Sequence, residues 1–418
     1  MRTPKSKLLR LFDGRQQAAM LVIAGFAVAG ALAVQFSGAQ ESPGSRASDN
    51  TSAAEESDAP VPTGNSSTAA VIPNDPRYDL PAFRISKVFD LWERSTGGQE
   101  VVVAVISSGV NAVHPEFKDK LVSPFDFINN NTDASPDDTG GGTNNAGVIA
   151  AVANNSVGMA GICWTCKVMP LDIADAEGNA PYANTEKAFK HAVDKGAKVI
   201  LMSFSYTTKE NAALQQAIKQ AYAKGITIIT NVPLDGKDTA TDPTFPSIVP
   251  EVITVISTND DDTINSLSNF GRDIDVAAPG IDVRGPSPET IDGYRLRSGN
   301  GVAAGVVAGI AGLLRSMYPQ ATPTDVFKAI TTTADTCCGG KISGGRVNAI
   351  KAADYLEKLY PSAPPAKTGD LNGDGKANIS DLSVLLTKWN SADAGADLNK
   401  DGKVGLTDLS ILLTNWTR

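Results

Sequence analysis

The sequence predicts a three-layer α/β domain with a mostly parallel sheet, followed by a small all-α module. Continuous apolar runs of strand length, such as VVVAVI at Val101–Ile106, are typical of strands buried on both faces of a parallel sheet. Apolar helical stretches alternate with further runs of this kind, and such alternation favours a parallel sheet. A tandem repeat at the carboxyl end predicts the module, because each copy joins an acidic loop to one short helix.

Composition sets the first limits on function. The chain has 418 residues, which is enough for two domains and additional tails. Its formal net charge is −9 and 42% of its residues are hydrophobic, the balance of a mildly acidic soluble protein. The sequence has no long basic stripe, and this argues against nucleic acid as a partner. Its two histidines, His114 and His191, limit the general bases available for catalysis.

The amino end predicts export. A basic segment at residues 1–17 precedes an apolar run at 18–36, which is close to the length of about 20 residues that a membrane span needs. A retained signal-anchor and a cleaved signal peptide both fit this pattern, and the length of the run favours the anchor. Both interpretations put the remainder outside the cytoplasm, at the cell surface or secreted. Residues 37–72 are polar, lack aromatic side chains and are expected to be a disordered linker.

Residues 73–360 are expected to form the main domain. An amphipathic first helix is predicted around Phe89 and Trp92, and the strand Val101–Ile106 follows it. Beyond these elements, helices at 183–195 and 212–224 are predicted to alternate with strands at 198–204, 226–230 and 252–257.

The stretch SGNGVAAGVVAGIAGLL at residues 298–314 is the most apolar part of this domain. Its glycines lie four residues apart at Gly301, Gly305 and Gly309. Small residues at this spacing also occur where membrane helices pack together. The apolar part ends at Arg315 and is shorter than the roughly 20 residues of a membrane span. We therefore predict a buried core helix.

Ordered blocks of the main domain resemble the subtilisin-like serine peptidases, the subtilase or S8 family. They cover about residues 74–357 and read, in chain order, NDPRYDL, VVVAVISSGVNAVHPEF, NNSVGMAGI, FPSIVPEVITV, SNFGRDIDVAAPG and GGRVNAIKA. The resemblance implies the subtilisin fold. It also implies a site in which a Ser nucleophile, a His base and an Asp that orients the His hydrolyse peptide bonds.

The catalytic positions implied by this resemblance hold other residues. The family's V-I-D-x-G reads VISSG, so Ser107 stands at the Asp position. GGGTNNAG stands in place of G-H-G-T-H-V-A-G and puts Gly141 at the His position. SGNGVAAG stands in place of S-G-T-S-M-A-A-P and puts Gly301 at the nucleophile position. The oxyanion Asn corresponds to Leu234, whose side chain offers no hydrogen-bond donor. We therefore expect a catalytically inactive domain, with an endopeptidase that uses other catalytic residues as the alternative.

The four cysteines form two pairs in the sequence. Cys163 and Cys166 make a CxxC, which fits a structural disulfide, a redox site or half a zinc site. An extracellular location favours the disulfide. Cys337 and Cys338 are adjacent, and a vicinal disulfide, free thiols and a cross-link to the CxxC stay open as alternatives.

A short stiff linker at 361–368 precedes the module at 369–418. The repeats DLNGDGKANISD and DLNKDGKVGLTD match the calcium-loop spacing D-x-N-x-D-G with an acid at position twelve. Oxygen donors at alternating positions suit Ca²⁺, which we therefore predict as the cofactor. The predicted ligands are Asp370, Asn372, Asp374, the Lys376 carbonyl, Asn378 and Asp381 in the first loop, and Asp397, Asn399, Asp401, the Lys403 carbonyl and Asp408 in the second.

These loop–helix duplicates resemble type I dockerin modules. The resemblance implies a cohesin-like partner domain and assembly outside the cell. In dockerins the two residues before position twelve often carry recognition. Here they are Ile379-Ser380 and Leu406-Thr407, where many dockerins have small hydroxyl pairs. A calcium-stabilised cap that contacts its own chain is the alternative function of the module.

The sequence as a whole predicts an exported, membrane-anchored pseudopeptidase of the subtilase fold. It would bind a protein or peptide ligand and assemble through the calcium-binding module. An active serine endopeptidase is the first alternative, and a component whose main task is cohesin docking is the second.

Overall fold

The computed structural model describes residues 34–35, 71–135, 137, 139–206, 210–361 and 368–417. The predicted basic segment lies outside these residues, as do nearly all of the apolar run at 18–36 and most of both linkers. The predictions made for these segments therefore stay predictions.

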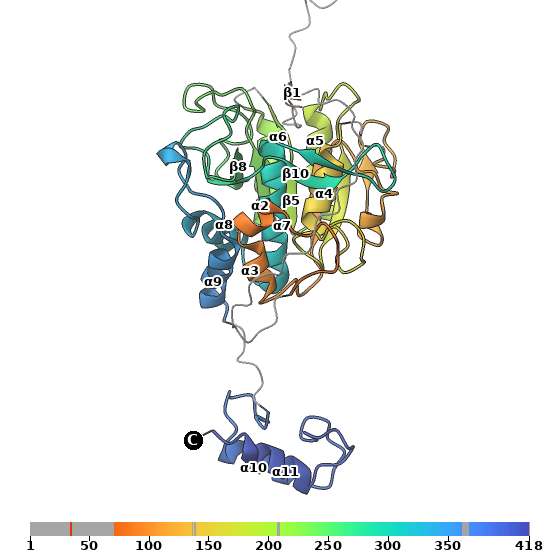
Figure 1. The fold of residues 1–418 in the computed structure, drawn as a ribbon, viewed down its shortest axis with the longest axis vertical. Helices are drawn as coiled ribbons and strands as arrows, with labels where there is room; N and C mark the ends of the chain where they lie inside the picture. Colours follow the sequence, from red (N-terminus) through yellow and green to blue (C-terminus); the bar gives the residue numbers. More distant parts are fainter. Residues whose placement is uncertain are drawn as a thin grey trace, which may run out of the picture.

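A seven-stranded sheet forms the middle layer of the main domain (Figure 1). Its strands lie in the order β3-β4-β2-β5-β7-β8-β9, and every neighbouring pair is parallel. The prediction of an α/β fold with a mostly parallel sheet is therefore confirmed. The strands are β2 (Val102–Ser107), β3 (Phe125–Asp126), β4 (Lys167–Asp172), β5 (Val199–Met202), β7 (Thr227–Asn231), β8 (Val252–Thr258) and β9 (Val276–Pro279).

Helices cover both faces of this sheet. Successive side chains of a strand point to opposite faces. Accordingly, Val103 and Val105 pack into one apolar cluster, and Ala104 and Ile106 pack into another. The first cluster includes α4 (Gly141–Ala150) and α7 (Asn300–Met317), and the second includes α5 (Tyr182–Asp194) and α6 (Ala212–Ala223).

Shorter elements complete the main domain. In place of the single helix predicted around Phe89 and Trp92 there are two, α2 (Pro81–Ile85) and α3 (Val88–Trp92). The break follows from Lys87, whose φ of 61° lies in the left-handed region and ends the first helix. The others are η1 (Pro115–Phe117), β6 (Ser205–Tyr206), β10 (Val283–Pro286), β11 (Tyr294–Arg297), α8 (Pro323–Thr332), η2 (Cys338–Gly340) and α9 (Ala349–Leu359).

Helix α7 contains the glycine-rich stretch and lies in the centre of the domain. Among the described residues it is the one helix long and apolar enough to cross a membrane, and 94% of that window is buried inside the protein. A Cβ on Gly309 would lie 2.9 Å from the Cβ of Ile162, so the missing side chain permits close packing there. The prediction of a buried core helix is confirmed.

Two disulfides are present. Cys163 and Cys166 are joined, as the extracellular interpretation favours, and both are fully buried. Cys337 and Cys338 are joined to each other, which selects the vicinal disulfide among the three alternatives for that pair.

The carboxyl-terminal module consists of two loop–helix units. Its helices are α10 (Ile379–Thr387) and α11 (Leu406–Thr414). Leu385 and Leu412 occupy the same position in the two repeats, and both are fully buried with Val404. The sequence repeat therefore produces one small core to which both units contribute.

Candidate functional site

The predicted catalytic positions lie at the carboxyl ends of the central strands. Ser107 is the last residue of β2, and Gly141 is the first residue of α4. A Cβ on Gly141 would lie 3.6 Å from the Ser107 Oγ. The structure thus brings these two positions together at the edge of an α/β sheet where ligands usually bind.

The other two positions lie at the start of α7 and in the loop after β7. Gly301 is in its first turn, directly after Asn300. The Asn300 Nδ2 donates to the carbonyl oxygens of Val232 and Pro233, at 2.9 and 3.1 Å. These bonds hold the loop after β7 against α7, and Leu234 follows in that loop.

Helices α4 and α7 also contact each other directly, because Gly305 of α7 faces the Asn145 side chain of α4. The four positions therefore belong to neighbouring elements of one region.

The two serine hydroxyls of this region, those of Ser107 and Ser108, differ in their partners. The buried Ser107 Oγ forms no hydrogen bond with any described residue. The Ser108 Oγ lies 2.6 Å from the Asp137 Oδ1 and 2.6 Å from the Thr139 Oγ1. A serine hydroxyl becomes an effective nucleophile when a neighbouring base removes its proton. The Asp137 carboxylate beside Ser108 also accepts from the Gly140 and Thr143 N–H groups, whereas Ser107 has no acceptor among the described residues.

Neither histidine supplies the missing base. His114 is buried between Phe117 and Tyr294, and its two ring nitrogens meet the Glu116 N–H and the Gly293 carbonyl. Burial is the main reason that the pKa of His114 is lowered. His191 lies on α5, where its Nε2 is 3.1 Å from the Ser123 carbonyl and its ring packs on Phe125. Both imidazoles therefore have structural partners.

Lys120 is the lysine with the clearest sign of burial. Burial lowers its pKa to about 8, and its Nζ donates to the Trp164 and Cys166 carbonyls. Trp164 and Cys166 come just before Lys167 in the chain, and Lys167 pairs with Val102 at the beginning of β2. Lys120 therefore lies at that end of the strand. Ser107 is at the other end of the same strand. Lys120 is therefore too far from Ser107 to act as its base.

Asp137 was not predicted, and it organises the start of α4. Its Oδ1 accepts from the Gly140 N–H and its Oδ2 from the Thr143 N–H, both at 2.7 Å. Burial raises the pKa of Asp137, while the bonds from Ser108, Thr143 and Gly140 act in the opposite direction. The carboxyl group satisfies first-turn N–H groups of a helix, a role that the sequence spacing alone does not reveal.

Two adjacent glycines at the start of α4, Gly141 and Gly142, lead to a prediction about the stability of the domain. A Cβ at position 142 would collide with the Gly109 carbonyl oxygen, whereas a Cβ at 141 meets only ordinary contacts. We expect Gly142→Ala to destabilise the main domain by about 1–3 kcal/mol, because overpacking forces the backbone to move. Gly141→Ala is the matched control and is expected to leave the melting temperature unchanged. Thermal unfolding followed by circular dichroism compares them, and equal melting temperatures would contradict the prediction.

The first loop of the carboxyl-terminal module brings three carboxylates together. Carboxylate oxygens of Asp370, Asp374 and Asp381 lie within 4.8 Å of one another. Backbone N–H groups orient them, since Asp370 accepts from Gly375 and Asp381 accepts from Leu371, at 2.7 and 2.8 Å. Three carboxylates this close repel one another, and a bound cation would relieve this repulsion. Their hard oxygen donors suit Ca²⁺.

The second loop repeats this backbone arrangement. The Asp397 Oδ2 accepts from the Gly402 N–H, and the Asp408 Oδ1 accepts from the Leu398 N–H, both at 2.7 Å. Among the described residues, only the carboxylates of the first loop gather within 4.8 Å. The second loop has Gly405 where the first has Asn378, so it offers one side-chain oxygen fewer.

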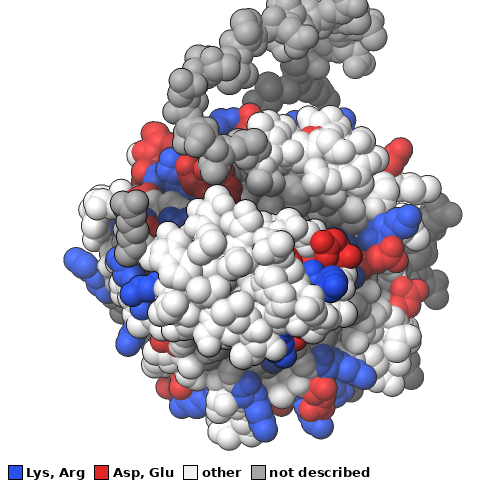
Figure 2. Space-filling model, turned by 90° about the horizontal axis from the view of Figure 1, so that it is seen from below, with Lys and Arg blue, Asp and Glu red and all other residues white. Residues whose placement is uncertain are grey.

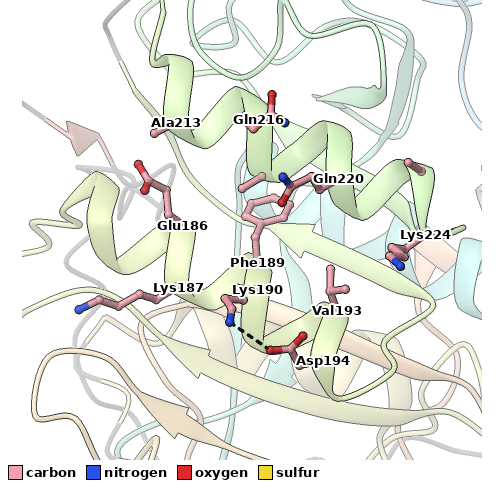
Figure 3. Close-up of a pocket in the computed structure, with 12 residues that line it drawn as sticks. Glu186, Lys187, Phe189, Lys190, Val193, Asp194, Ala213, Gln216, Gln220 and Lys224 are labelled. Atoms are coloured by element: carbon pink, nitrogen blue, oxygen red, sulfur yellow. Dashed lines mark ion pairs between the residues drawn. The ribbon is translucent and has the colours of Figure 1, made fainter.

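A separate groove of about 620 Å³ lies between α5 and α6. Figure 3 shows the Phe189 ring between the two helices and the Lys190–Asp194 ion pair, at 3.7 Å, on its border. Its lining contains no Ser, Thr, Cys or His among the described residues, so the groove offers no catalytic nucleophile with a base. It lies on the α5–α6 side of the sheet, whereas α4 and α7 are on the other.

Comparisons with known proteins agree with this geometry. The model of the Subtilase family matches residues 98–374, and the model of the Dockerin type I domain matches residues 367–415. Thermitase from Thermoactinomyces vulgaris is 34% identical over 293 residues, which cover 68% of this chain and 99% of that protein. The cell wall-associated protease from Bacillus subtilis is 31% identical over 70% of this chain and 32% of its own length. Among solved structures, a protease from Pseudoalteromonas arctica PAMC 21717 superposes with a TM-score of 0.61 at 26% identity, over 68% of this chain and 98% of that chain.

Proposed function

The chain belongs to the subtilase family, and we propose that it uses this fold to hold peptide or protein ligands without cleaving them. The observation that carries this proposal is the set of residues at the catalytic positions. Ser107, Gly141 and Gly301 stand where the family has its Asp, His and Ser, and Leu234 stands at the oxyanion position. Gly141 lies beside Ser107 at the end of β2, and both histidines are engaged elsewhere. The proposed domain boundaries are 73–360 for this part and 369–418 for the dockerin domain.

The comparisons taken alone favour a second candidate, a serine endopeptidase. Thermitase, the thermophilic serine proteinase of Bacillus sp. and the cell wall-associated protease are all proteases by name, and they share 31–34% of their aligned residues with this chain. Similarity to active enzymes supports this candidate better than the binding role. In this chain it requires a nucleophile and a base other than the family's catalytic residues. Ser107 and Ser108 are the serines whose hydroxyls lie nearest to Gly141.

The dockerin domain supports Ca²⁺ as the cofactor. We propose that Asp370, Asn372, Asp374, the Lys376 carbonyl, Asn378 and Asp381 hold one ion. The second ion would be held by Asp397, Asn399, Asp401, the Lys403 carbonyl and Asp408. The clustering of the first set of carboxylates supports the first site directly. Bound Ca²⁺ would neutralise these carboxylates and hold each loop closed against its helix.

A dockerin domain also supports a protein partner, and a cohesin-like domain is the proposed one. Ile379 and Leu406, just before position twelve, are 68% and 76% exposed and occupy equivalent positions in the two repeats. Large apolar side chains that remain this exposed are available for contact with another protein. Recognition through them would be more apolar than through the hydroxyl pairs of many dockerins.

The same similarities support an extracellular or cell-surface location. Attachment of the chain to a membrane through residues 18–36 remains part of the proposal.

The face shown in Figure 2 carries Lys and Arg interspersed with Asp and Glu, around a broad area without charged residues.

Peptide capture by the immobilised full-length chain tests the proposed function. The chain is incubated with a tryptic digest of casein, washed and eluted, and the eluted peptides are sequenced by mass spectrometry. We expect a reproducible set of retained peptides with only tryptic ends. Retention no better than that of an immobilised unrelated protein would contradict the binding role. New, non-tryptic ends would support the endopeptidase.

A further inference from the structure

Two arginines of the β10–β11 hairpin point toward the start of α4. The hairpin is antiparallel, with Gly285 opposite Arg295. It packs on α4, since Gly285 contacts Asn144 and Pro286 contacts Gly147. Residues two apart on a strand share a face. Arg295 and Arg297 therefore face α4 together, while Leu296 between them is exposed.

The two guanidinium groups converge on Gly140. A Cβ on Gly140 would lie 2.7 Å from the Arg297 Nη1 and 3.3 Å from the Arg295 Nη2. Gly140 is the residue before the ten-residue helix α4, and its φ of 77° suits glycine. The amino end of a helix carries a partial positive charge. Three positive groups thus meet at one point.

Arg297 is the unusual member of this group. It is only 3% exposed, and neither its Nε nor its Nη1 forms a hydrogen bond with any described residue. Burial and the neighbouring Arg295 lower the pKa of Arg297. Two buried guanidinium nitrogens without acceptors are costly, so the arrangement favours an anionic partner.

The nearby carboxylates do not supply that partner through a hydrogen bond. Asp137 attracts Arg297 electrostatically, but its oxygens accept from Ser108, Gly140 and Thr143. Glu289 is exposed and pairs with Arg295 at 2.5 Å. The Nε and Nη1 groups of Arg297 therefore have no acceptor among the described residues.

We propose that Arg297, with Arg295 and the start of α4, binds the carboxylate group of a peptide ligand. Hydrogen bonds from a guanidinium to a carboxylate are charge-assisted and therefore strong. Arg295 is 32% exposed and provides the side from which the ligand enters. At the start of α4, Gly141 has no Cβ, and this leaves space next to the unpaired Ser107 hydroxyl.

The proposed function makes the ligand a peptide or a protein. This inference rests on the proposed function, because it specifies how a bound peptide is recognised.

Isothermal titration calorimetry of the full-length chain tests the proposal with three peptides. N-acetyl-Ala-Ala-Ala carries a free terminal carboxylate, its carboxyl-terminal amide carries none, and N-acetyl-Ala-Asp-Ala-amide carries only a side-chain carboxylate. We expect at least one of the two acids to bind about tenfold or more tightly than the neutral amide, as charge-assisted hydrogen bonds predict. The acid that binds tighter identifies the source of the carboxylate.

Arg297→Gln is expected to remove this preference, and Arg297→Lys to keep part of it through the charge alone. Arg94→Gln is the matched control, because Arg94 is paired with Asp354 on α9, away from the hairpin. Circular dichroism establishes that each variant is folded. If Arg297→Gln does not fold, Arg295→Gln replaces it as the test variant. The ratio of the affinities of the acidic and the neutral peptides for the unaltered chain then tests the proposal independently of any variant.

Three outcomes would overturn this proposal without contradicting the proposed function. Equal binding of acids and amide would leave peptide binding intact but remove the carboxylate site. An unchanged preference in folded Arg297→Gln would place the site elsewhere. Binding of inorganic phosphate at Arg297, without preference for acidic peptides, would make the ligand a free anion. Failure of all three peptides to bind would instead contradict the proposed function together with this inference.

Discussion

Denatured casein is expected to stay intact when it is incubated with the full-length chain, at turnover rates about a millionfold below those of thermitase. The scale is set by subtilisin, a member of the same family, in which removal of the nucleophile or the base lowers kcat by about that factor. Here the family resemblance assigns Gly301, Gly141 and Leu234 to the positions of the nucleophile, the base and the oxyanion donor. Release of a fluorophore from labelled casein measures the rate.

The controls for this experiment separate a weak enzyme from a contaminant. Thermitase that has been inhibited at its serine gives the background. Hydrolysis that persists through purification and is lost in Ser107→Ala would contradict the prediction and support the endopeptidase. Hydrolysis unaffected by Ser107→Ala and Ser108→Ala would be assigned to a contaminating protease.

Removal of calcium is expected to unfold the dockerin domain and leave the subtilase domain folded. The carboxylates of Asp370, Asp374 and Asp381 lie within 4.8 Å of one another and repel without a cation. A ligand present at a thousand times its Kd stabilises the folded state by about 4 kcal/mol, so EDTA removes a stabilisation of this size. Differential scanning calorimetry should show one transition that moves to lower temperature and one that does not.

Two variants sharpen the calcium experiment. Asp374→Ala removes a predicted ligand and should reproduce the effect of EDTA on the module. Lys376→Ala is the matched control, since Lys376 is predicted to bind through its backbone carbonyl. If EDTA leaves both transitions in place, or if the two variants behave alike, the calcium loops do not work as proposed.

Much of the fold could be predicted because its signals are local. The alternation of apolar runs and helical stretches placed β5, β7 and β8 within a few residues of their bounds. The glycines of α7 indicated close packing, and the buried helix has it. The break between α2 and α3 was missed, since a left-handed Lys87 has no reliable sequence signature.

The candidate site was predictable only where motifs marked it. Ser107, Gly141 and Gly301 were found through the aligned blocks, and the structure brings the first two together. Asp137 and Arg297 were missed because their importance arises from tertiary contacts. Alternating basic residues, as in Arg295-Leu296-Arg297, are common on exposed strands. Only the packing of the hairpin on α4 turns this pattern into a buried charge.

Labelling with a fluorophosphonate probe tests the absence of a catalytic serine most directly. The full-length chain is treated with the probe beside thermitase, and both intact masses are measured. We expect full modification of thermitase and an unchanged mass for this chain, because among the described residues neither histidine lies beside Ser107 or Ser108. A stoichiometric mass increase on a serine, lost in Ser107→Ala or Ser108→Ala, would contradict it.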